Sequence, residues 1–344
     1  MLYLSTNSRY DTYTAYRAIH HDTAPDGGLF LPFRLPKFDG EAIRQLSAQP
    51  YWQTISQLLY RLLGVRLTAQ ALCDAMGGQI PCIHAIQHRV AIARLWQKEQ
   101  PDFEDGLAAV SRLLRVEEPE APASSWLRVA VRIAAIFGLY GLLVSEKQLE
   151  QGEKLDITLS TGDFSAPMAA WFAREMGLPI GTIVIGCNEN SGLWDLFNLG
   201  DIATGETVLE TLTPLCDYNA PVGLGRLIYR VLGPEEAVRF ETIRRAGRHY
   251  VPQEEAFEQL RAGIFTAVSS ISRVDSVIRN VCSTAQYILS PYDALAYGAL
   301  LDYRSKSGQG STCLLLSERS PLCDDRTVAY ALGIEAQQLA DQLQ

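Results

Sequence analysis

The chain is 344 residues long, with 47% hydrophobic residues, 20% charged residues and a formal net charge of −9. These values are typical of a soluble globular protein with one large or two ordinary domains, and they exclude a disordered or repetitive chain. The negative charge argues against nucleic acid as a partner, because a phosphate backbone is bound through clustered Lys and Arg, and this sequence has no such cluster.

Cysteine and histidine usage indicates a reducing compartment and predicts no metal site. The seven cysteines are an odd number without CxxC spacing, and the five histidines are scattered. No apolar signal segment is visible in the first thirty residues. The apolar stretch Trp126–Val144 is uninterrupted only from Ile133 onward, so it is too short to span a bilayer and predicts a buried core helix. We therefore expect a cytoplasmic protein without membrane contact.

In chain order, the sequence divides into a predicted N-terminal cap, residues 1–80, and an α/β core, residues 81–344. In the cap, hydrophobic periodicity predicts helices over Tyr13–Ile19, Tyr51–Leu63 and Thr68–Met76. In the core it predicts strands over Arg89–Leu95, Leu155–Leu159, Thr182–Ile185 and Thr312–Leu316. The predicted core helices are Glu104–Arg115, Trp126–Val144, Gly192–Leu199, Val222–Leu232, Glu235–Ala246, Gln253–Ser270, Arg273–Cys282 and Tyr292–Ser305.

The centre of the core is a predicted strand–loop–helix–strand unit between Leu155 and Asn190. Its loop, Thr161-Gly162-Asp163-Phe164-Ser165, would direct backbone N–H groups and a helix N-terminus at one spot. Such a spot suits a phosphate-type anion. The alternative is an ordinary turn of a βαβ unit without a ligand, because a single glycine loop is weak evidence for binding.

Two stretches resemble the threonine synthase family of fold type II enzymes that use pyridoxal 5′-phosphate (PLP). In that family a Ser-Gly-Asn-Phe-Gly loop holds the cofactor phosphate, and Thr161–Ser165 is the similar loop here, followed by Gly177-Leu178-Pro179 and Asn188-Glu189-Asn190. The segment Ala24–Pro32, APDGGLFLP, resembles the family's amino terminus. The resemblance implies the tryptophan synthase β-like PLP fold, with a parallel sheet flanked by helices in a large domain.

The resemblance also implies that the catalytic lysine is missing. The family's lysine lies in the motif His-Gly-Pro-Thr-Leu-Ala-Phe-Lys-Asp-Phe, and alignment on Phe103 and Asp105 places Glu104 at its position. A carboxylate cannot form the imine with PLP. Lys98 lies six residues earlier and is the alternative amine. Without a ligand, Phe103-Glu104-Asp105 is a helix start whose acidic residues complement the helix dipole.

A second departure from the family is a predicted deletion around residues 115–125. In the family, a substrate-carboxylate loop and most of a small α/β domain separate the lysine helix from the next helix, whereas here only Val116–Ser125 joins the two. Loss of that domain uncovers apolar surface. Trp96, Phe103 and Trp126 flank the connection, and they either form an exposed patch or fold inward and fill the cleft.

The predicted cofactor-binding residues are altered as well. Asp163 and Ser165 replace the family's Asn and second Gly, so a phosphate would meet a like charge. Ser317 keeps the hydroxyl of the family's Thr near the pyridine nitrogen, whereas the family's Pro-His-Thr-Ala is Pro291-Tyr292-Asp293-Ala294 here. The candidate cofactor-binding residues are Thr161, Gly162, Asp163, Phe164, Ser165 and Ser317.

The first hypothesis is a catalytically inactive threonine-synthase-like protein, a pseudoenzyme with a binding or regulatory role. No cofactor is expected, although weak binding of PLP or phosphate is compatible with the loop. The alternative is a PLP-dependent threonine synthase, an enzyme of amino-acid biosynthesis that converts O-phosphohomoserine to threonine, or a related lyase. A third hypothesis is an unrelated anion-binding α/β protein. A homodimer or another protein partner is expected to cover the uncovered surface.

Overall fold

The computed structural model describes residues 1–115, 122–205, 207–308 and 310–343. Its centre is a six-stranded sheet in the order β10-β7-β6-β11-β5-β4, in which only β4 runs antiparallel to its neighbour. The six strands of this sheet are β4 (Cys82–Gln87), β5 (Val90–Arg94), β6 (Leu155–Ser160), β7 (Ile180–Cys187), β10 (Ile264–Val268) and β11 (Thr312–Ser317).

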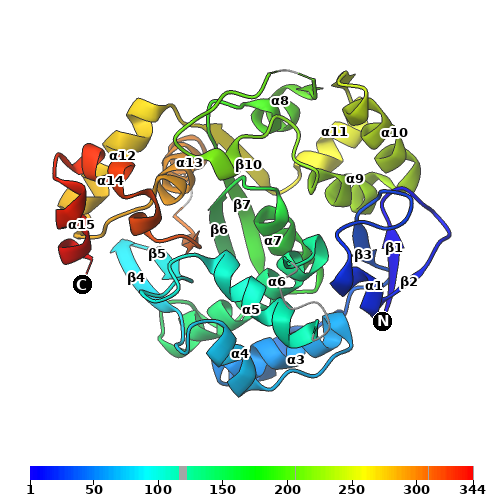
Figure 1. Cartoon of the computed structure of the whole chain (residues 1–344), viewed down its shortest axis with the longest axis horizontal. Coiled ribbons are helices and arrows are strands. Elements are labelled where there is room, and N and C mark those ends of the chain that lie inside the picture. Colours follow the sequence, from blue (N-terminus) through cyan, green and yellow to red (C-terminus); the bar gives the residue numbers. More distant parts are fainter. Residues whose placement is uncertain (116–121, 206, 309, 344) are drawn as a thin grey trace.

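Helices cover both faces of this sheet (Figure 1). Along β5, Ala91 and Ala93 face one hydrophobic core, and Val90 and Ile92 face the other. Continuous apolar runs such as the buried β11 are typical of strands covered on both faces. The first face carries α5 (Phe103–Leu114), α6 (Ser125–Ser145) and α7 (Ser165–Glu175), and the second carries α12 (Ile271–Ala285), α13 (Pro291–Ser307), α14 (Asp325–Leu332) and α15 (Ala336–Gln342).

The N-terminal segment packs beside the first face. It contains a three-stranded antiparallel sheet in the order β2-β1-β3 and four helices. These elements are β1 (Leu2–Ser5), β2 (Tyr13–Thr14), α1 (Ala15–His20), β3 (Phe30–Pro32), α2 (Gly40–Ser47), α3 (Tyr51–Leu63) and α4 (Ala69–Ala75). The predicted helix Tyr13–Ile19 therefore begins as a strand pairing with β1.

A further group of elements packs beyond β7 and β10, at the upper right of Figure 1. It consists of α8 (Gly192–Leu199), β8 (Ile202–Ala203), a 3₁₀ turn η1 (Pro214–Cys216), α9 (Leu224–Leu232), α10 (Pro234–Arg245), β9 (His249–Tyr250) and α11 (Glu254–Arg261). Outside this group, a second 3₁₀ turn, η2 (Pro321–Asp324), follows β11.

The predicted helix Gln253–Ser270 is wrong. The helix α11 ends at Arg261, and Gly263, with φ +69°, redirects the chain into the edge strand β10. An L-residue at this φ is strained, so glycine permits the turn. The sheet gains its sixth strand from this segment.

The predicted βαβ unit is confirmed. The strands β6 and β7 pair in parallel, and α7 connects them.

The long apolar helix α6 is also buried as predicted. It is long and apolar enough to cross a membrane, but 83% of its most apolar window lies inside the protein. A Cβ on Gly138 would lie 2.6 Å from the ring of Tyr51, so the glycine permits the close packing of α6 on α3.

The aromatic residues that flank the predicted deletion fold inward. Trp96, Phe103 and Trp126 are 6%, 2% and 0% exposed. The indole of Trp126 donates a 3.0 Å hydrogen bond to the hydroxyl of Tyr3, which ties α6 to the N-terminal sheet. Of the predicted deletion, residues 116–121 lie outside the described residues, and Ser124 provides the N-cap of α6.

Candidate functional site

The loop after β6 is a tight turn that leads directly into α7. Gly162 has φ +47° and Phe164, the residue before the helix, has φ +72°. Such a conformation is uncommon for a bulky residue. Burial of the Phe164 ring, 1% exposed, holds it in place. The turn therefore directs the N-terminus of α7 to the carboxyl ends of the parallel strands, where α/β folds place their ligands.

An aspartate carboxylate occupies this helix start. Oδ1 of Asp163 accepts a 2.9 Å hydrogen bond from the Ser165 N–H and another from the Ser165 hydroxyl, while Oδ2 lies 3.6 Å from Nη1 of Arg128. Burial raises the pKa of Asp163, but Arg132, the Ser165 donors and Arg128 outweigh it, so the pKa lies below its ordinary value. Asp163 is thus an ionised internal anion, bound as an external phosphate would be.

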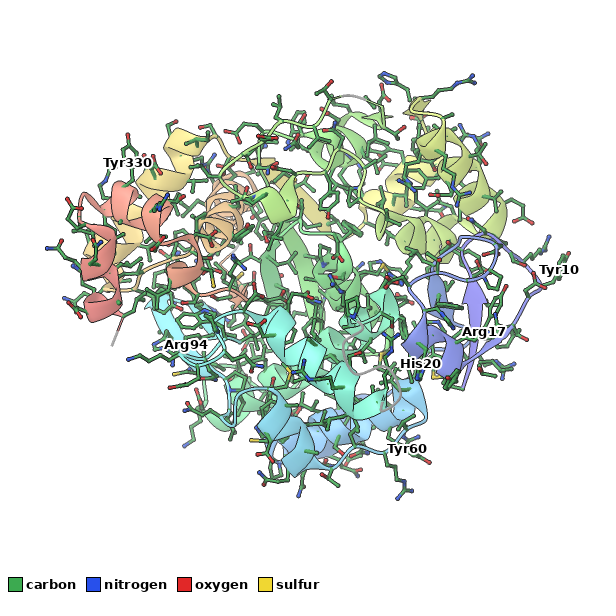
Figure 2. All side chains as sticks on the ribbon, in the orientation of Figure 1. Tyr10, Arg17, His20, Tyr60, Arg94 and Tyr330 are labelled. Atoms are coloured by element: carbon green, nitrogen blue, oxygen red, sulfur yellow. The ribbon has the colours of Figure 1, made fainter. Side chains whose placement is uncertain are left out.

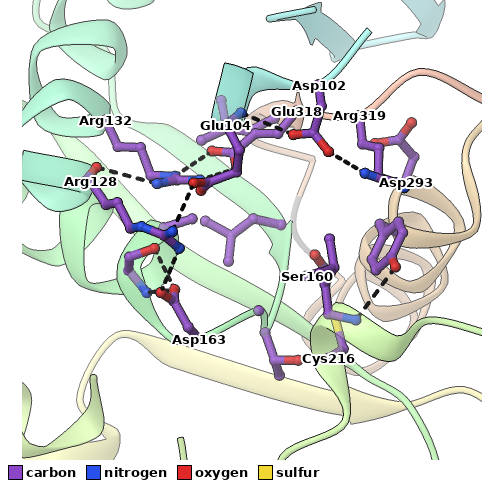
Figure 3. Close-up of a pocket in the computed structure, with 18 of the residues that line it drawn as sticks. Asp102, Glu104, Arg128, Arg132, Ser160, Asp163, Cys216, Asp293, Glu318 and Arg319 are labelled. Carbon is purple, nitrogen blue, oxygen red and sulfur yellow. Dashed lines mark hydrogen bonds and ion pairs between the residues drawn. The ribbon is translucent and has the colours of Figure 1, made fainter. Parts of the chain in front are cut away.

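Glu104 lies across the cleft from Asp163 and pairs with two arginines of α6 (Figure 3). Its Oε1 is 2.9 Å from Nη2 of Arg132, and its Oε2 is 3.3 Å from Nη2 of Arg128. As predicted, Glu104 is in the first turn of α5, where its N–H donates to the N-cap residue Asp102 at 2.9 Å.

Arg132 joins three elements at the wall of the cleft. Its Nε and Nη2 bind both oxygens of Glu318, after β11, at 2.7 and 2.6 Å, in addition to Glu104 of α5. Burial lowers the pKa of Arg132, but the carboxylates of Glu318 and Glu104 outweigh this effect and raise it. Its side chain is 6% exposed and lies over the ring of Phe103 at 5.2 Å. The guanidinium is therefore fully committed to protein groups.

At the carboxyl end of β11, behind the cleft, buried side chains are linked by hydrogen bonds. The hydroxyl of Ser317 donates to Oδ2 of Asp293 at 2.9 Å and accepts from the indole of Trp96 at 3.1 Å. Burial, the largest cause, raises the pKa of Asp293 to about 7. Ser317 is 0% exposed. Its hydroxyl is therefore already paired within the protein.

These groups surround one cleft, whose volume is about 830 Å³ when the open solvent at its mouth is included. Of the predicted residues, Thr161, Gly162, Asp163, Ser165 and Glu104 line it, whereas Phe164 and Ser317 are buried beside it. Five acidic residues and three arginines line the cleft: Asp102, Glu104, Asp163, Asp293, Glu318, Arg128, Arg132 and Arg319.

None of the five lysines of the sequence lies in this cleft. Lys37, Lys98, Lys147, Lys154 and Lys306 are all exposed at the protein surface. Lys98, the alternative amine, lies in the turn between β5 and α5.

Sequence reasoning did not predict the arginines of the cleft. The signal was present, because Arg128 and Arg132 are spaced i, i+4 in an otherwise apolar helix and so share one face. A charge in a helix that is buried on all sides needs a partner. Glu318 and Cys216, which also lines the cleft, gave no such signal.

Comparisons with known proteins agree with this architecture. Residues 2–76 match the family model "Threonine synthase N terminus". The human protein threonine synthase-like 1 is 25% identical over 179 residues, 51% of this chain and 24% of that protein. Threonine synthase of Corynebacterium glutamicum is 27% identical over 189 residues, 53% of this chain and 39% of that enzyme. The matches therefore span less than half of either relative.

Two solved structures share the fold over nearly the whole chain. PLP-bound threonine synthase from Brucella melitensis superposes with a TM-score of 0.83 at 18% identity, covering 97% of this chain and 92% of that one. The yeast threonine synthase superposes with a TM-score of 0.84 at 16% identity, covering 96% and 90%. The amino-terminal match, the related sequences and the superpositions together show that the chain is similar to threonine synthases and has their α/β fold.

Proposed function

We propose that this chain is a pseudoenzyme of the threonine synthase family, which has a binding or regulatory role and performs no lysine–PLP chemistry. The observation that carries the proposal is the pairing of Glu104 with Arg128 and Arg132 in a cleft that no lysine lines. PLP chemistry in this fold requires an amine to bond covalently to the cofactor. The sequence resemblance puts Glu104 at that position, and two guanidinium groups neutralise its carboxylate.

The residues of the cleft do not fit lysine-linked PLP. The donors at the start of α7, the N–H and hydroxyl of Ser165, are taken by the carboxylate of Asp163. A phosphate at that place would have to displace this carboxylate or lie beside its charge, which near a surface costs about 1–4 kcal/mol at 4 Å. Arg132 cannot compensate, because Glu318 and Glu104 hold it.

The alternative function is a PLP-dependent threonine synthase or a related lyase. Two observations favour it over an unrelated anion-binding protein. The first is the superposition on a PLP-bound threonine synthase. The second is the hydroxyl of Thr161, which lines the cleft beside the thiol of Cys216, with Oγ1 buried and without a hydrogen bond of ordinary geometry among the described residues. That oxygen is a candidate contact for a bound cofactor that the chain does not hold covalently.

Reduction with borohydride after incubation with PLP distinguishes the two functions. We expect no single lysine to be labelled stoichiometrically in the peptide mass analysis, because all five are exposed. An active threonine synthase treated in parallel is the positive control. Stoichiometric labelling of one lysine, above all Lys98, would overturn the proposal. Tight, unlabelled PLP with turnover of O-phosphohomoserine would favour the alternative.

A further inference from the structure

Three side chains beside the β4–β5 hairpin have buried polar atoms without a hydrogen-bond partner among the described residues. These atoms are Nε2 of His84, Nε of Arg94 and the hydroxyl of Tyr287. An unsatisfied buried polar group costs about 1–3 kcal/mol, so most such groups in native proteins are paired with protein, water or an ion. Three of them together therefore require an explanation.

The three side chains come together from different elements. In the antiparallel pair β4–β5, His84 is opposite Ile92 and Cys82 is opposite Arg94, so His84 and Arg94 lie on the same face of the sheet. Tyr287 follows α12, and its ring centroid lies 5.2 Å from that of His84. Figure 2 shows Arg94 on the β4–β5 side of the molecule, across from Tyr10 and Arg17 in the N-terminal segment.

All three side chains can donate hydrogen bonds at neutral pH. Burial and the charge of Asp293 raise the pKa of Tyr287, against Arg94 and the neighbouring Ser317 side chain, so its hydroxyl keeps its proton. Burial and the charge of Arg94 lower the pKa of His84, so the ring is neutral and has an N–H on one nitrogen. The guanidinium of Arg94 remains charged and lies over the ring of Trp96 at 5.0 Å. The cluster thus offers several donors and one full positive charge.

The positive charge is not compensated within the described residues. Arg128, Arg132 and Arg319 each pair with a carboxylate, whereas Arg94 has no ion pair there. The acidic group on this side, Asp293, is buried behind Ser317 and accepts the hydroxyl of that residue and the N–H of Ser290. The terminal nitrogens of Arg94 likewise have no partner among the described residues and are absent from the buried unpaired atoms, so they face solvent.

We propose that Arg94, His84 and Tyr287 form a binding site for a small oxyanion, a carboxylate or a phosphate. The guanidinium supplies the charge and paired donors that match such an anion, and the tyrosine hydroxyl and histidine N–H supply further donors. The site is separate from the cleft, because none of the three residues lines the cleft. It does not depend on the proposed function.

Titration calorimetry on the intact chain tests this site, with inorganic phosphate in one arm and succinate in the other. We expect one of the two anions to bind saturably at one site per chain. Loss of a hydrogen-bonded charge in Arg94→Leu should weaken that binding roughly tenfold or more, and loss of one neutral donor in Tyr287→Phe roughly three- to tenfold. Whichever of phosphate and succinate binds identifies the class of oxyanion.

Arg66→Leu is the matched control. Arg66 is also an arginine over an aromatic ring, 4.8 Å from that of Tyr60, and it lies outside the site. The control should bind as the unmodified chain does. Tyr287→Phe also keeps the test valid if Arg94→Leu misfolds. It should change the melting temperature of the anion-free protein little, because the hydroxyl has no hydrogen bond of ordinary geometry to lose among the described residues.

Three results would overturn the proposal. One is no saturable binding of either anion, which would mean that water satisfies these donors. Another is unchanged affinity in both Arg94→Leu and Tyr287→Phe. The third is binding lost in Arg128→Leu and retained in Arg94→Leu, which would place the anion in the cleft.

Discussion

We propose that Glu104 occupies the position of the family's catalytic lysine, as the sequence resemblance implies. We predict that Glu104→Lys restores no threonine formation from O-phosphohomoserine, because catalytic groups that act as a unit do not contribute separately. The ammonium would also face Arg128 and Arg132, which now bind the carboxylate at 3.3 and 2.9 Å, so the melting temperature should fall. Glu104→Gln is the control for loss of the charge alone. Appreciable turnover by the lysine variant would contradict this prediction.

Asp163 should control anion binding at the start of α7. Replacing it with Asn removes a like charge and should tighten phosphate or PLP binding several-fold, because the helix N-terminus and Arg128 remain. Calorimetry in an Arg94→Leu background isolates the cleft from the second anion site. Asp201→Asn, at a half-exposed carboxylate that contacts His249 outside the cleft, is the control. Equal affinities before and after the substitution at Asp163 would mean that its carboxylate does not face the bound anion.

Asp293 should make the stability of the protein depend on pH. Burial, opposed by hydrogen bonds from Ser290 and Ser317, raises its pKa to about 7, whereas an unfolded aspartate titrates near 3.9. Between these values the folded state holds a proton that the unfolded chain has released. The protonated carboxyl of Asp293 therefore makes its full contribution to the free energy of unfolding below about pH 4. Above that pH the contribution falls by about 1.4 kcal/mol per pH unit until about pH 7.

Urea unfolding between pH 4.5 and 8 measures this contribution. The side chain of Asn cannot titrate, so the difference in unfolding free energy between the parent chain and Asp293→Asn should change steadily up to about pH 7 and then level off. Parallel stability curves for the two proteins would show that Asp293 does not titrate in this range.

Among the elements, α5, α6 and β11 are joined through one buried guanidinium. We predict that Arg132→Leu lowers the free energy of unfolding by about 3–5 kcal/mol, because Glu318 and Glu104 lose their buried partner. Arg128→Leu should cost less, because its side chain is 31% exposed. Urea denaturation of both variants checks the order. Equal losses, or no loss at Arg132, would contradict it.

Helices and strands could be predicted where a pattern in the local sequence indicates them. Helix α3 begins at Tyr51 and ends at Leu63, as its apolar periodicity predicts, and α8 likewise spans Gly192–Leu199. The segment Gln253–Ser270 failed because its continuous apolar spacing concealed the turn at Gly263. The strand β4 was not predicted, because it is only partly buried and its apolar and polar residues do not alternate clearly.

The residues of the site could likewise be predicted only where a local motif contains them. The loop Thr161–Ser165 and Glu104 could be placed from motifs, because those motifs are continuous in the sequence. The pairing of Arg132 with Glu318 joins residues 186 positions apart, and no local pattern encodes it. The commitment of Ser317 to Asp293 and Trp96 depends in the same way on the assembled sheet.

For the whole molecule, we expect a homodimer. Trp96, Phe103 and Trp126 are buried and cannot form the interface. Exposed apolar residues instead gather on the segment that borders the cleft, with exposed fractions of 40–54%: Val208, Leu209, Leu215, Tyr218 and Val222. A self-complementary patch on this segment would cover itself in a symmetric pair of chains.

Light scattering behind a sizing column at micromolar concentration tests the dimer. Leu209→Ser with Val222→Ser should shift the mass toward the monomer, because both residues lie in the segment and outside the cleft lining. Tyr330→Ser, at a 77% exposed residue of α14, should leave the mass unchanged. A monomeric parent chain, with no change on addition of a threonine synthase from the same cell, would refute the dimer.

The carboxylate of Asp163 has one further consequence, which concerns competition. It is attached two residues from the N–H that it binds, so its effective concentration there is fixed by the chain and cannot be diluted. Even flexible short tethers give about millimolar values, and this turn is held rigid by the buried Phe164. A phosphate from solution has to compete with this effective concentration in order to bind at the helix N-terminus. We therefore expect the loop to keep the same shape whether the cell is rich or poor in small phosphorylated molecules.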